Sequence, residues 1–290
     1  MKGRSTMKKI GNVSDCYDAY TNIRFKSYDQ GVMWMEDDPE MLSVGFDYEE
    51  EELRQIITKL SQQAAEMAEV VRSAHGEKMQ RILTGKQFKF AIIGCSFSSE
   101  YLSYINVVTE LLKSYEGIEM IDAAVTAETV PQTMAHIYNR VLRHQPDICS
   151  LYMGINDMRR NRDVYTKNNV SPGEFCRDMN YLVDMLRSCG SQIILHTLTP
   201  CNIPAQERGV SDKRWTYRID DWDIFNGIIR EAAEQKNCVL NDQAKKLEQF
   251  HGEVNIPENG LHLTREAQEF LALQFMDVFL ETVRTKYGEI

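Results

Sequence analysis

The chain has 290 residues, 43% of them hydrophobic, so it is long enough to bury a substantial core in one large domain or in one domain with an extension. It carries 33 Lys and Arg against 43 Asp and Glu, which gives a formal net charge of −10. This acidic balance argues against nonspecific nucleic-acid binding, because such binding needs an excess of cationic surface.

The N-terminal stretch "MKGRSTMKKIGNVSDCYDAY" is basic and polar and contains no apolar segment of the signal-peptide kind. No later run approaches the roughly 18 apolar residues of a membrane span. The seven cysteines are scattered, with no C-x-x-C pair, which argues against a disulfide framework or a zinc site. We therefore expect a cytoplasmic protein that does not associate with membranes and uses no metal or other cofactor.

Residues 1–86 are predicted to form an N-terminal extension. Residues 27–47 indicate irregular structure with Trp34 and Met35 as apolar anchors, and residues 46–83 predict one long amphipathic helix. Two interpretations of this helix stay open: it packs against the rest of the chain, or it forms a homodimer or partner surface. Its apolar positions recur at helical spacing and are Leu53, Ile56, Ile57, Leu60, Ala64, Met67, Val70 and Val71.

From residue 88 onward, short apolar runs alternate with segments of helical periodicity. The runs are 88–94, 118–125, 147–154, 191–198 and 237–242, and the helical segments lie near 100–115, 130–144, 172–188, 222–236 and 264–285. Continuous apolar strands that alternate with helices are typical of a parallel sheet covered on both faces. We therefore predict a three-layer α/β sandwich with a five-stranded parallel sheet over residues 87–290.

Ligands of such sheets bind outside the carboxyl ends of the strands, so the residues just after each run are informative. Gly94-Cys95-Ser96 follows the first run, "DAAVTAET" (122–129) includes the end of the second, and "GINDM" (154–158) follows the third. "ENGLHLT" (258–264) precedes the last helix and carries His262. A serine, backbone amides, an asparagine and a histidine are the components of acyl-transfer chemistry, although each motif alone is also typical of a turn or a helix cap.

In their order along the chain and in their residue pattern, these segments resemble the conserved blocks of the SGNH/GDSL hydrolases. Gly94-Cys95-Ser96 matches the family's first block, and Gly154-Ile155-Asn156-Asp157 matches its third block, Gly-x-Asn-Asp, in full. Asn259-Gly260-Leu261-His262 aligns with the last block, Asp-x-x-His, and Ala124 or its neighbour falls where the second block usually supplies a glycine. The resemblance covers roughly residues 88–285 and implies the flavodoxin-like fold of that family.

The resemblance implies that Ser96 attacks an ester carbonyl and that His262 acts as general base. The side chain of Asn156 and the backbone N–H groups of Ser96 and of the residue near Ala124 then form the oxyanion hole. The function it implies is that of a serine esterase or deacetylase acting on a small O-acyl ester, such as an ester of a carbohydrate. Two alternatives are an acyltransferase using the same site and a catalytically silent binding or scaffold protein with this fold.

Two departures from the family pattern bear on this function. Cys95 replaces the usual aspartate before the nucleophile and is itself an alternative nucleophile. Asn259 stands where the family has the aspartate that orients the histidine, and an amide does not supply the negative charge. Three interpretations follow: Glu258 takes over the aspartate's role, a main-chain carbonyl orients His262 in a Ser–His dyad, or the site is inactive.

Residues close to these blocks are candidates for substrate binding. They are Cys95, Asp157, Arg159 and Trp215, the last two in basic and aromatic segments near the expected mouth of the site. Aromatic and cationic side chains together suit a sugar or an anionic substrate. The alternative is a solvated loop whose arginines pair with nearby aspartates. The other histidines lack such neighbours, so we interpret them as structural or solvated.

Overall fold

The computed structural model describes residues 27–29, 34–36, 39–40, 49–161, 167–204, 215–257 and 260–288. Its centre is a five-stranded sheet with the order β4-β3-β5-β7-β9, in which all neighbouring strands run parallel. The predicted α/β fold is therefore confirmed, and each strand lies within one of the apolar runs. The strands are β3 (Phe88–Gly94), β4 (Ile118–Asp122), β5 (Ile148–Tyr152), β7 (Gln192–His196) and β9 (Val239–Asn241).

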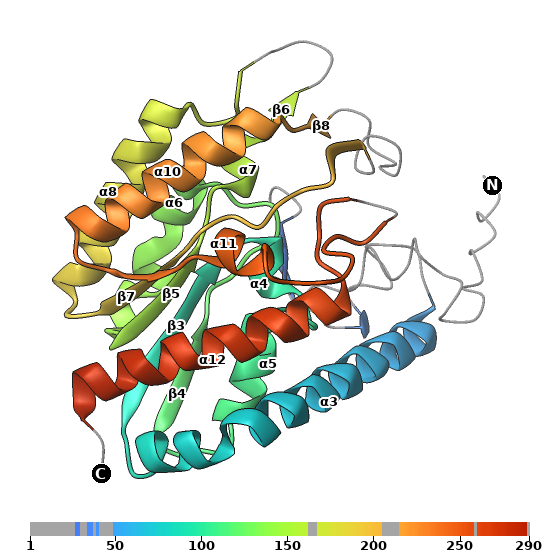
Figure 1. Ribbon diagram of the computed structural model, residues 1–290, viewed down its shortest axis with the longest axis vertical. Coiled ribbons are helices and arrows are strands. Elements are labelled where there is room, and N and C mark those ends of the chain that lie inside the picture. The colour runs from blue at the N-terminus through green and yellow to red at the C-terminus, as the bar shows by residue number, and fades with distance from the viewer. Residues whose placement is uncertain are drawn as a thin grey trace.

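Helices cover both faces of this sheet (Figure 1). One layer contains α3 (Glu50–Leu83), α5 (Tyr104–Leu112) and α12 (Arg265–Tyr287), which contact one another. The other layer contains α6 (Val130–Arg140), α8 (Pro172–Ser188) and α10 (Ile219–Gln235). Every residue of β5 is buried, because a central strand covered on both faces is shielded from water on each side. The short helices η1 (Leu142–His144) and α11 (Gln243–Leu247) complete this part of the fold.

The long helix α3 packs against α5 and α12. It begins with three glutamates, whose charge is favourable at the N-terminal end of a helix. Of the predicted apolar stripe, Ile57 is half-buried and Val70 is 42% exposed, whereas Ala68 is buried instead. This packing accounts for the stripe within a single chain, and a homodimer through α3 stays a prediction. The other members of the stripe are buried: Leu53, Ile56, Leu60, Ala64, Met67 and Val71.

Two small antiparallel sheets were not expected from the sequence. β1 (Ser27–Asp29) pairs with β2 (Trp34–Glu36), so the expectation of irregular structure was wrong for these residues; the side chains of Trp34 and Met35 lie outside the described part of the chain. β6 (Arg160–Asn161) pairs with β8 (Trp215–Thr216). Strands of two or three residues are too short to produce a recognisable alternation of apolar and polar side chains.

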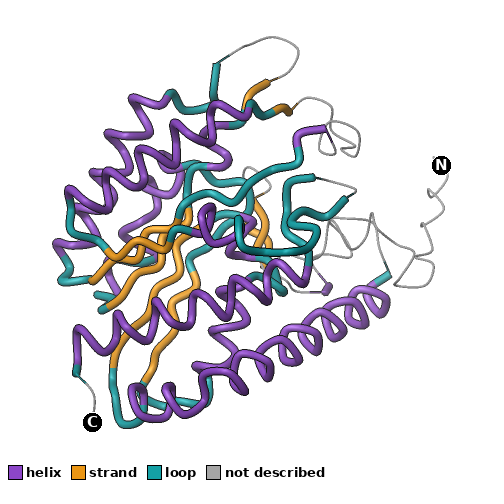
Figure 2. Tube along the Cα trace, in the orientation of Figure 1, coloured by secondary structure: helices purple, strands orange, loops and turns teal. Residues whose placement is uncertain are grey.

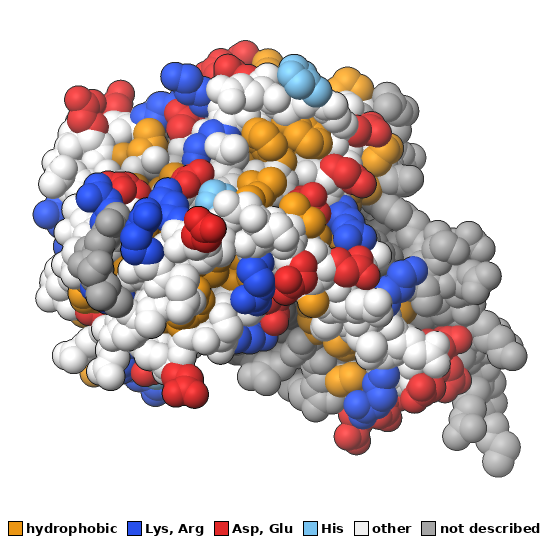
Figure 3. Space-filling view, turned by 60° about the horizontal axis from the view of Figure 1, so that its bottom comes forward, with side chains coloured by type: hydrophobic (Ala, Val, Ile, Leu, Met, Phe, Trp, Pro, Cys, Tyr) orange, Lys and Arg blue, Asp and Glu red, His pale blue; other side chains and the backbone are white. Residues whose placement is uncertain are grey.

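The carboxyl ends of the strands meet at one edge of the sheet, where loops and short helices gather (Figure 2). There α4 (Ser96–Ser99) follows β3 and α7 (Ile155–Met158) follows β5 almost directly. Elsewhere, acidic and basic side chains are interspersed on the face shown in Figure 3. Among the described residues, no helix has the length and apolar character needed to cross a membrane.

Candidate active site

Ser96 lies at a sharp turn from β3 into α4. Gly94 ends the strand, Cys95 is the N-cap and Ser96 is the first helical residue. A side chain at Gly94 would place its Cβ 2.6 Å from the Cβ of Ser98 and 3.4 Å from the carbonyl oxygen of Tyr152. Only glycine therefore lets the short helix turn back this close to the strand. The turn leaves Ser96 7% exposed at the sheet edge.

His262 lies beside this serine. Its Nε2 is 3.0 Å from Ser96 Oγ, although the two residues are 166 positions apart in the chain. The histidine loop is closed by a bridge between Asn255 and Leu263 and by a hydrogen bond from Ile256 N–H to the His262 carbonyl, at 2.8 Å. A hydroxyl and an imidazole nitrogen at this distance have the geometry for transfer of the serine proton to the histidine.

Asn255 joins the histidine loop to the segment that follows β7, a role that was not expected from the sequence. Its side-chain amide donates to the carbonyls of Pro200 and Leu261, each at 2.9 Å. Asn202 N–H adds a hydrogen bond of 2.7 Å to the Gly260 carbonyl. In the sequence, Asn255 stands among proline, asparagine and glycine, which indicates only a turn.

The expected oxyanion donors come from three neighbouring strand ends. Val125 N–H donates to the Gly94 carbonyl at 2.9 Å, which holds the loop after β4 against the β3–α4 turn. In this loop Ala124 N–H donates to Asp122 Oδ1 at 3.2 Å. Asn156, 5% exposed in α7, donates from Nδ2 to the Glu128 carbonyl of the same loop at 3.1 Å. The topology thus brings the Ala124 loop and Asn156 to the edge that carries Ser96.

Gly154 makes the turn that presents Asn156. Its φ of 129° is a backbone conformation that favours glycine, and a Cβ there would approach the Phe175 ring to 3.0 Å. The Met158 N–H donates to the Gly154 carbonyl at 2.9 Å, which closes the single turn of α7. Asn156 is therefore held by a turn that tolerates no side chain at its first position.

Cys95 and Asp157, which were predicted to bind substrate, are both buried, and burial argues against direct contact with a substrate. Cys95 is fully buried, and burial raises the pKa of its thiol to about 12, so it is neither exposed nor ionised near neutral pH. This also argues against Cys95 as the nucleophile. Asp157 is equally buried, and its Oδ1 accepts a hydrogen bond of 2.9 Å from Val130 N–H at the start of α6. Burial raises the pKa of Asp157 to about 7.

The remaining predicted site residues are placed only in part. Arg159 is half-buried and lies close enough to the buried Tyr217 to affect its phenol electrostatically. Trp215 belongs to β8, but its side chain lies outside the described part of the chain. Glu258 and Asn259 also lie outside the described residues. Arg159, Trp215, Glu258 and Asn259 therefore stay predictions.

The alternative interpretation of the basic segment was a solvated loop whose arginines pair with aspartates. The pairing is confirmed for Arg160, but the pair is not solvated. Its guanidinium forms two hydrogen bonds with Asp221, of 2.7 and 2.8 Å, and both side chains are largely buried. A two-point pair of this kind fixes orientation as well as charge. It fastens β6 to the first turn of α10 beside the candidate site.

His196 has the structural role predicted for the histidines outside the motifs. It is fully buried, with its Nε2 2.7 Å from Ser150 Oγ and its Nδ1 2.9 Å from Asn241 Nδ2. Tyr104 OH lies 3.1 Å from the same Nδ1. Burial lowers the pKa of His196 to about 3, so the ring is neutral and satisfied by polar neighbours.

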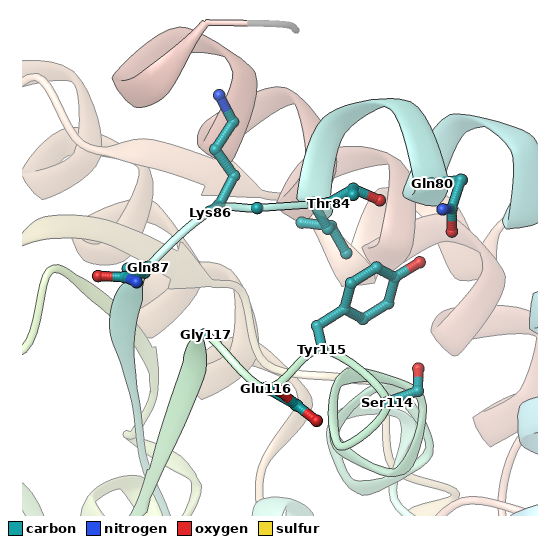
Figure 4. Close-up of a pocket in the computed structure, with 10 residues that line it drawn as sticks. Gln80, Thr84, Lys86, Gln87, Ser114, Tyr115, Glu116 and Gly117 are labelled. Carbon is teal, nitrogen blue, oxygen red and sulfur yellow. The ribbon is translucent and has the colours of Figure 1, made fainter.

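A cavity of about 530 Å³ lies away from these residues (Figure 4). It is lined by the end of α3, by the turn before β3 and by residues 114–117 before β4, including Lys86 and Tyr115. These segments precede the first residues of β3 and β4, so the cavity lies at the amino ends of the strands. It contains none of the residues that surround Ser96.

The sequence profile of the GDSL-like Lipase/Acylhydrolase family matches residues 91–270, which is more than half of the chain. The chain belongs to this family. The match includes Ser96, Asn156 and His262, the three residues that the fold brings to one edge of the sheet. No curated protein matches the chain.

Solved structures of GDSL-family and other esterases share this fold. Axe2, an acetylxylan esterase from Geobacillus stearothermophilus, superposes with a TM-score of 0.52 at 20% identity, over 68% of this chain and 95% of that one. The acetyl xylan esterase AlAXEase gives 0.51 at 19% identity, over 65% and 98%. A lipase/acylhydrolase from Enterococcus faecalis gives 0.55 at 16% identity, over 69% and 97%. At such identities the likeness shows the fold alone.

Proposed function

We propose that this GDSL-family chain is a serine esterase that removes a small acyl group from an oxygen of a polar substrate. The observation that carries the proposal is the 3.0 Å contact between Ser96 Oγ and His262 Nε2, at the sheet edge that also holds Asn156. The nucleophile and the amide donor then come from two strand ends and the base from the loop before α12, and together they are the groups that acyl-transfer chemistry uses.

In this mechanism Ser96 Oγ attacks the ester carbonyl while His262 takes the hydroxyl proton. The negative charge on the carbonyl oxygen is met by Asn156 Nδ2 and by the backbone N–H groups of Ser96 and Ala124, the latter exchanging its contact with Asp122 for the oxyanion. The C–O bond to the alcohol breaks, and His262 returns the proton to the departing oxygen. Water then attacks the acyl-serine by the same route, which releases the acid and restores Ser96.

A small acyl group suits the position of Ala124. The second block of the family usually supplies a glycine here, and Ala124 adds a methyl group beside one oxyanion donor while keeping its amide. The names of the solved relatives Axe2 and AlAXEase point to acetyl groups on a carbohydrate. Both facts favour an acetyl ester of a polyhydroxylated alcohol as the substrate class.

One observation favours a second candidate, a catalytically silent protein with this fold. Asn259 stands where the family has an aspartate, and in serine proteases the equivalent exchange lowers kcat by roughly 10⁴.

An acyltransferase differs from the esterase only in the acceptor, because an alcohol replaces water in the second half of the reaction.

The test is hydrolysis of a small activated aryl acetate between about pH 6 and pH 9, with the wild-type protein, Ser96→Ala and Cys95→Ala. We expect Ser96→Ala to lose at least about 1,000-fold in kcat/KM and Cys95→Ala to keep most of the activity. Added alcohols that divert the acyl group would identify a transferase. A Ser96→Ala protein as active as the wild type would contradict the proposal, and an inactive wild type would favour the silent candidate.

A further inference from the structure

Three rings, those of His262, Phe97 and Tyr152, are stacked next to Ser96. The ring of Phe97 lies against the imidazole of His262, with centroids 4.9 Å apart and planes inclined by 23°. On the other side of Phe97, the ring of Tyr152 lies at 5.3 Å and 21°. Phe97 directly follows Ser96 in α4, so one short helix supplies both the partner of the histidine nitrogen and the surface under its ring.

The rings of Tyr152, Phe97 and His262 form a column, and its Tyr152 end is held in place by burial and hydrogen bonds. Phe97 is 1% exposed and Tyr152 is fully buried. The Tyr152 hydroxyl lies 3.1 Å from Thr199 Oγ1 and accepts a hydrogen bond of 3.2 Å from Thr199 N–H. Trp222 Nε1 donates to the Thr199 carbonyl at 2.7 Å, which ties this support to α10. Phe97 therefore has little freedom to move away from the imidazole.

The Cys95 thiol and the Tyr152 and Tyr217 phenols beside the column are uncharged near neutral pH. Burial raises the pKa of the Cys95 thiol to about 12 and raises the pKa of the Tyr152 and Tyr217 phenols above their ordinary value. Two further groups couple to them electrostatically: the guanidinium of Arg159, and the carboxyl of Asp157, which is only partly ionised near neutral pH because its pKa is about 7. On the side of Phe97, the face of the imidazole thus lies against an aromatic ring.

When His262 takes the Ser96 proton its ring becomes a cation, and the face of an aromatic ring within about 6 Å attracts a cation. This chain also has Asn259 at the position where the family supplies a negative charge. We propose that Phe97, backed by Tyr152, is a positioning residue that holds the imidazole of His262 and stabilises its protonated form. The inference rests on the proposed function, in which His262 is the general base.

The most direct test replaces Phe97 with pentafluorophenylalanine, which keeps the shape of the ring but removes the negative charge of its face. We expect kcat for an aryl acetate to fall by about 3- to 10-fold with KM little changed. We also expect the acidic limb of the kcat/KM profile to move to lower pH, because the protonated imidazole loses support. A residue needed only for packing would lower the rate without moving that limb.

The same shift is measurable without a substrate. The ring protons of His262, identified by comparison with His262→Gln, are titrated by NMR in the unmodified and the fluorinated protein. We expect a lower midpoint in the fluorinated protein. Because this readout needs no turnover, it tests the inference even where ester hydrolysis fails. An unchanged midpoint together with an unchanged acidic limb would overturn the role of Phe97.

A pair of truncations separates this effect from loss of packing. Phe97→Leu and Phe279→Leu each remove a buried aromatic ring, and Phe279 lies in the core beside Phe88 and Phe90, away from the site. Both variants are expected to unfold at a lower temperature than the wild type. Only Phe97→Leu should move the His262 titration, and an equal shift in both variants would contradict the inference.

Discussion

At the scale of single residues, Cys95 and Ser96 are neighbours with opposite environments. The Cys95 side chain points into the core, where burial keeps its thiol protonated, whereas Ser96 reaches the sheet edge and contacts His262. The difference arises because Cys95 caps α4 with an extended backbone and Ser96 is its first helical residue. One step along the chain therefore separates an inert thiol from a hydroxyl with an adjacent base.

Asn259 occupies the position at which the family has an aspartate. Asn259→Asp would place a negative charge where the family uses one to stabilise the protonated histidine, so we expect kcat to rise by about 10-fold or more. Glu258→Gln, measured beside it with the same aryl acetate, shows whether Glu258 already supplies that charge. If Asn259→Asp gives no gain and Glu258→Gln abolishes activity, Glu258 is the acidic partner and the expectation for Asn259 is wrong.

Asp157 gives a prediction about stability and pH. Its pKa in the folded protein, about 7, lies above its ordinary value of 3.8, so the folded state binds this proton more tightly than the unfolded state. The contribution of Asp157 to the free energy of unfolding is therefore present at low pH and is lost as the pH rises from about 4 to about 7. Asp157→Asn keeps an oxygen for Val130 N–H and should remove this loss. Urea unfolding at several pH values measures it, and an unchanged pH dependence would contradict the assignment.

At the scale of elements, the turns that end β3 and β5 decide where the site lies. Each passes from a buried strand into one turn of helix, and each depends on a glycine, Gly94 or Gly154, that a larger residue cannot replace without strain or collision. Beside them, the Arg160–Asp221 pair joins β6 to α10. The candidate site is thus built from strand ends, with one buried ion pair holding a neighbouring segment.

Gly154→Ala tests the turn that presents Asn156. The substitution forces a side chain into a backbone conformation with φ of 129° and toward the Phe175 ring, so we expect a loss of about 1–3 kcal/mol in the free energy of unfolding. Ester hydrolysis should fall as well, because Asn156 lies two residues on. The matched control is Gly173→Ala at the start of α8, where a Cβ meets no atom within 4 Å and alanine favours the helix. Equal stability of the two variants would contradict this account.

Some of these elements could be predicted from the sequence and others could not. The apolar run at 88–94 predicted both ends of β3 correctly. The blocks around Ser96, Asn156 and His262 indicated the site, because the carboxyl ends of parallel strands share one edge of a sheet and ligands bind there. Phe97 and Asn255 were missed because their roles depend on which ring or carbonyl lies opposite them in the fold. β6 and β8 were missed because pairing of two residues with two others leaves no pattern in the chain.

At the scale of the whole molecule, α3 is an integral part of one helical layer. It packs against α5 and α12, and most of its apolar stripe is buried within this chain. Figure 1 shows it running obliquely across the lower part of the view, beside α12 and α5. Residues outside the part matched by the family profile therefore help to cover the hydrophobic core.

Removal of α3 should consequently damage the whole fold. A chain without residues 1–84 would expose the apolar surface of α5 and α12 that α3 covers, so we expect aggregation in size-exclusion chromatography and a lower unfolding temperature. A chain without residues 1–48, which keeps α3, is the control and should stay closer to the wild type. An unaggregated 85–290 chain with an unchanged unfolding temperature would contradict this role.

The central claim, that Ser96 is a nucleophile activated by His262, is tested most directly by covalent labelling with a small fluorophosphonate, followed by mass spectrometry of the intact protein and its peptides. The reagent needs no knowledge of the natural substrate, because the serine oxygen displaces fluoride from phosphorus. We expect one adduct per chain, located on Ser96, and labelling slowed by at least about 100-fold in His262→Ala. An adduct on another residue, or labelling of Ser96 that does not depend on His262, would contradict the account.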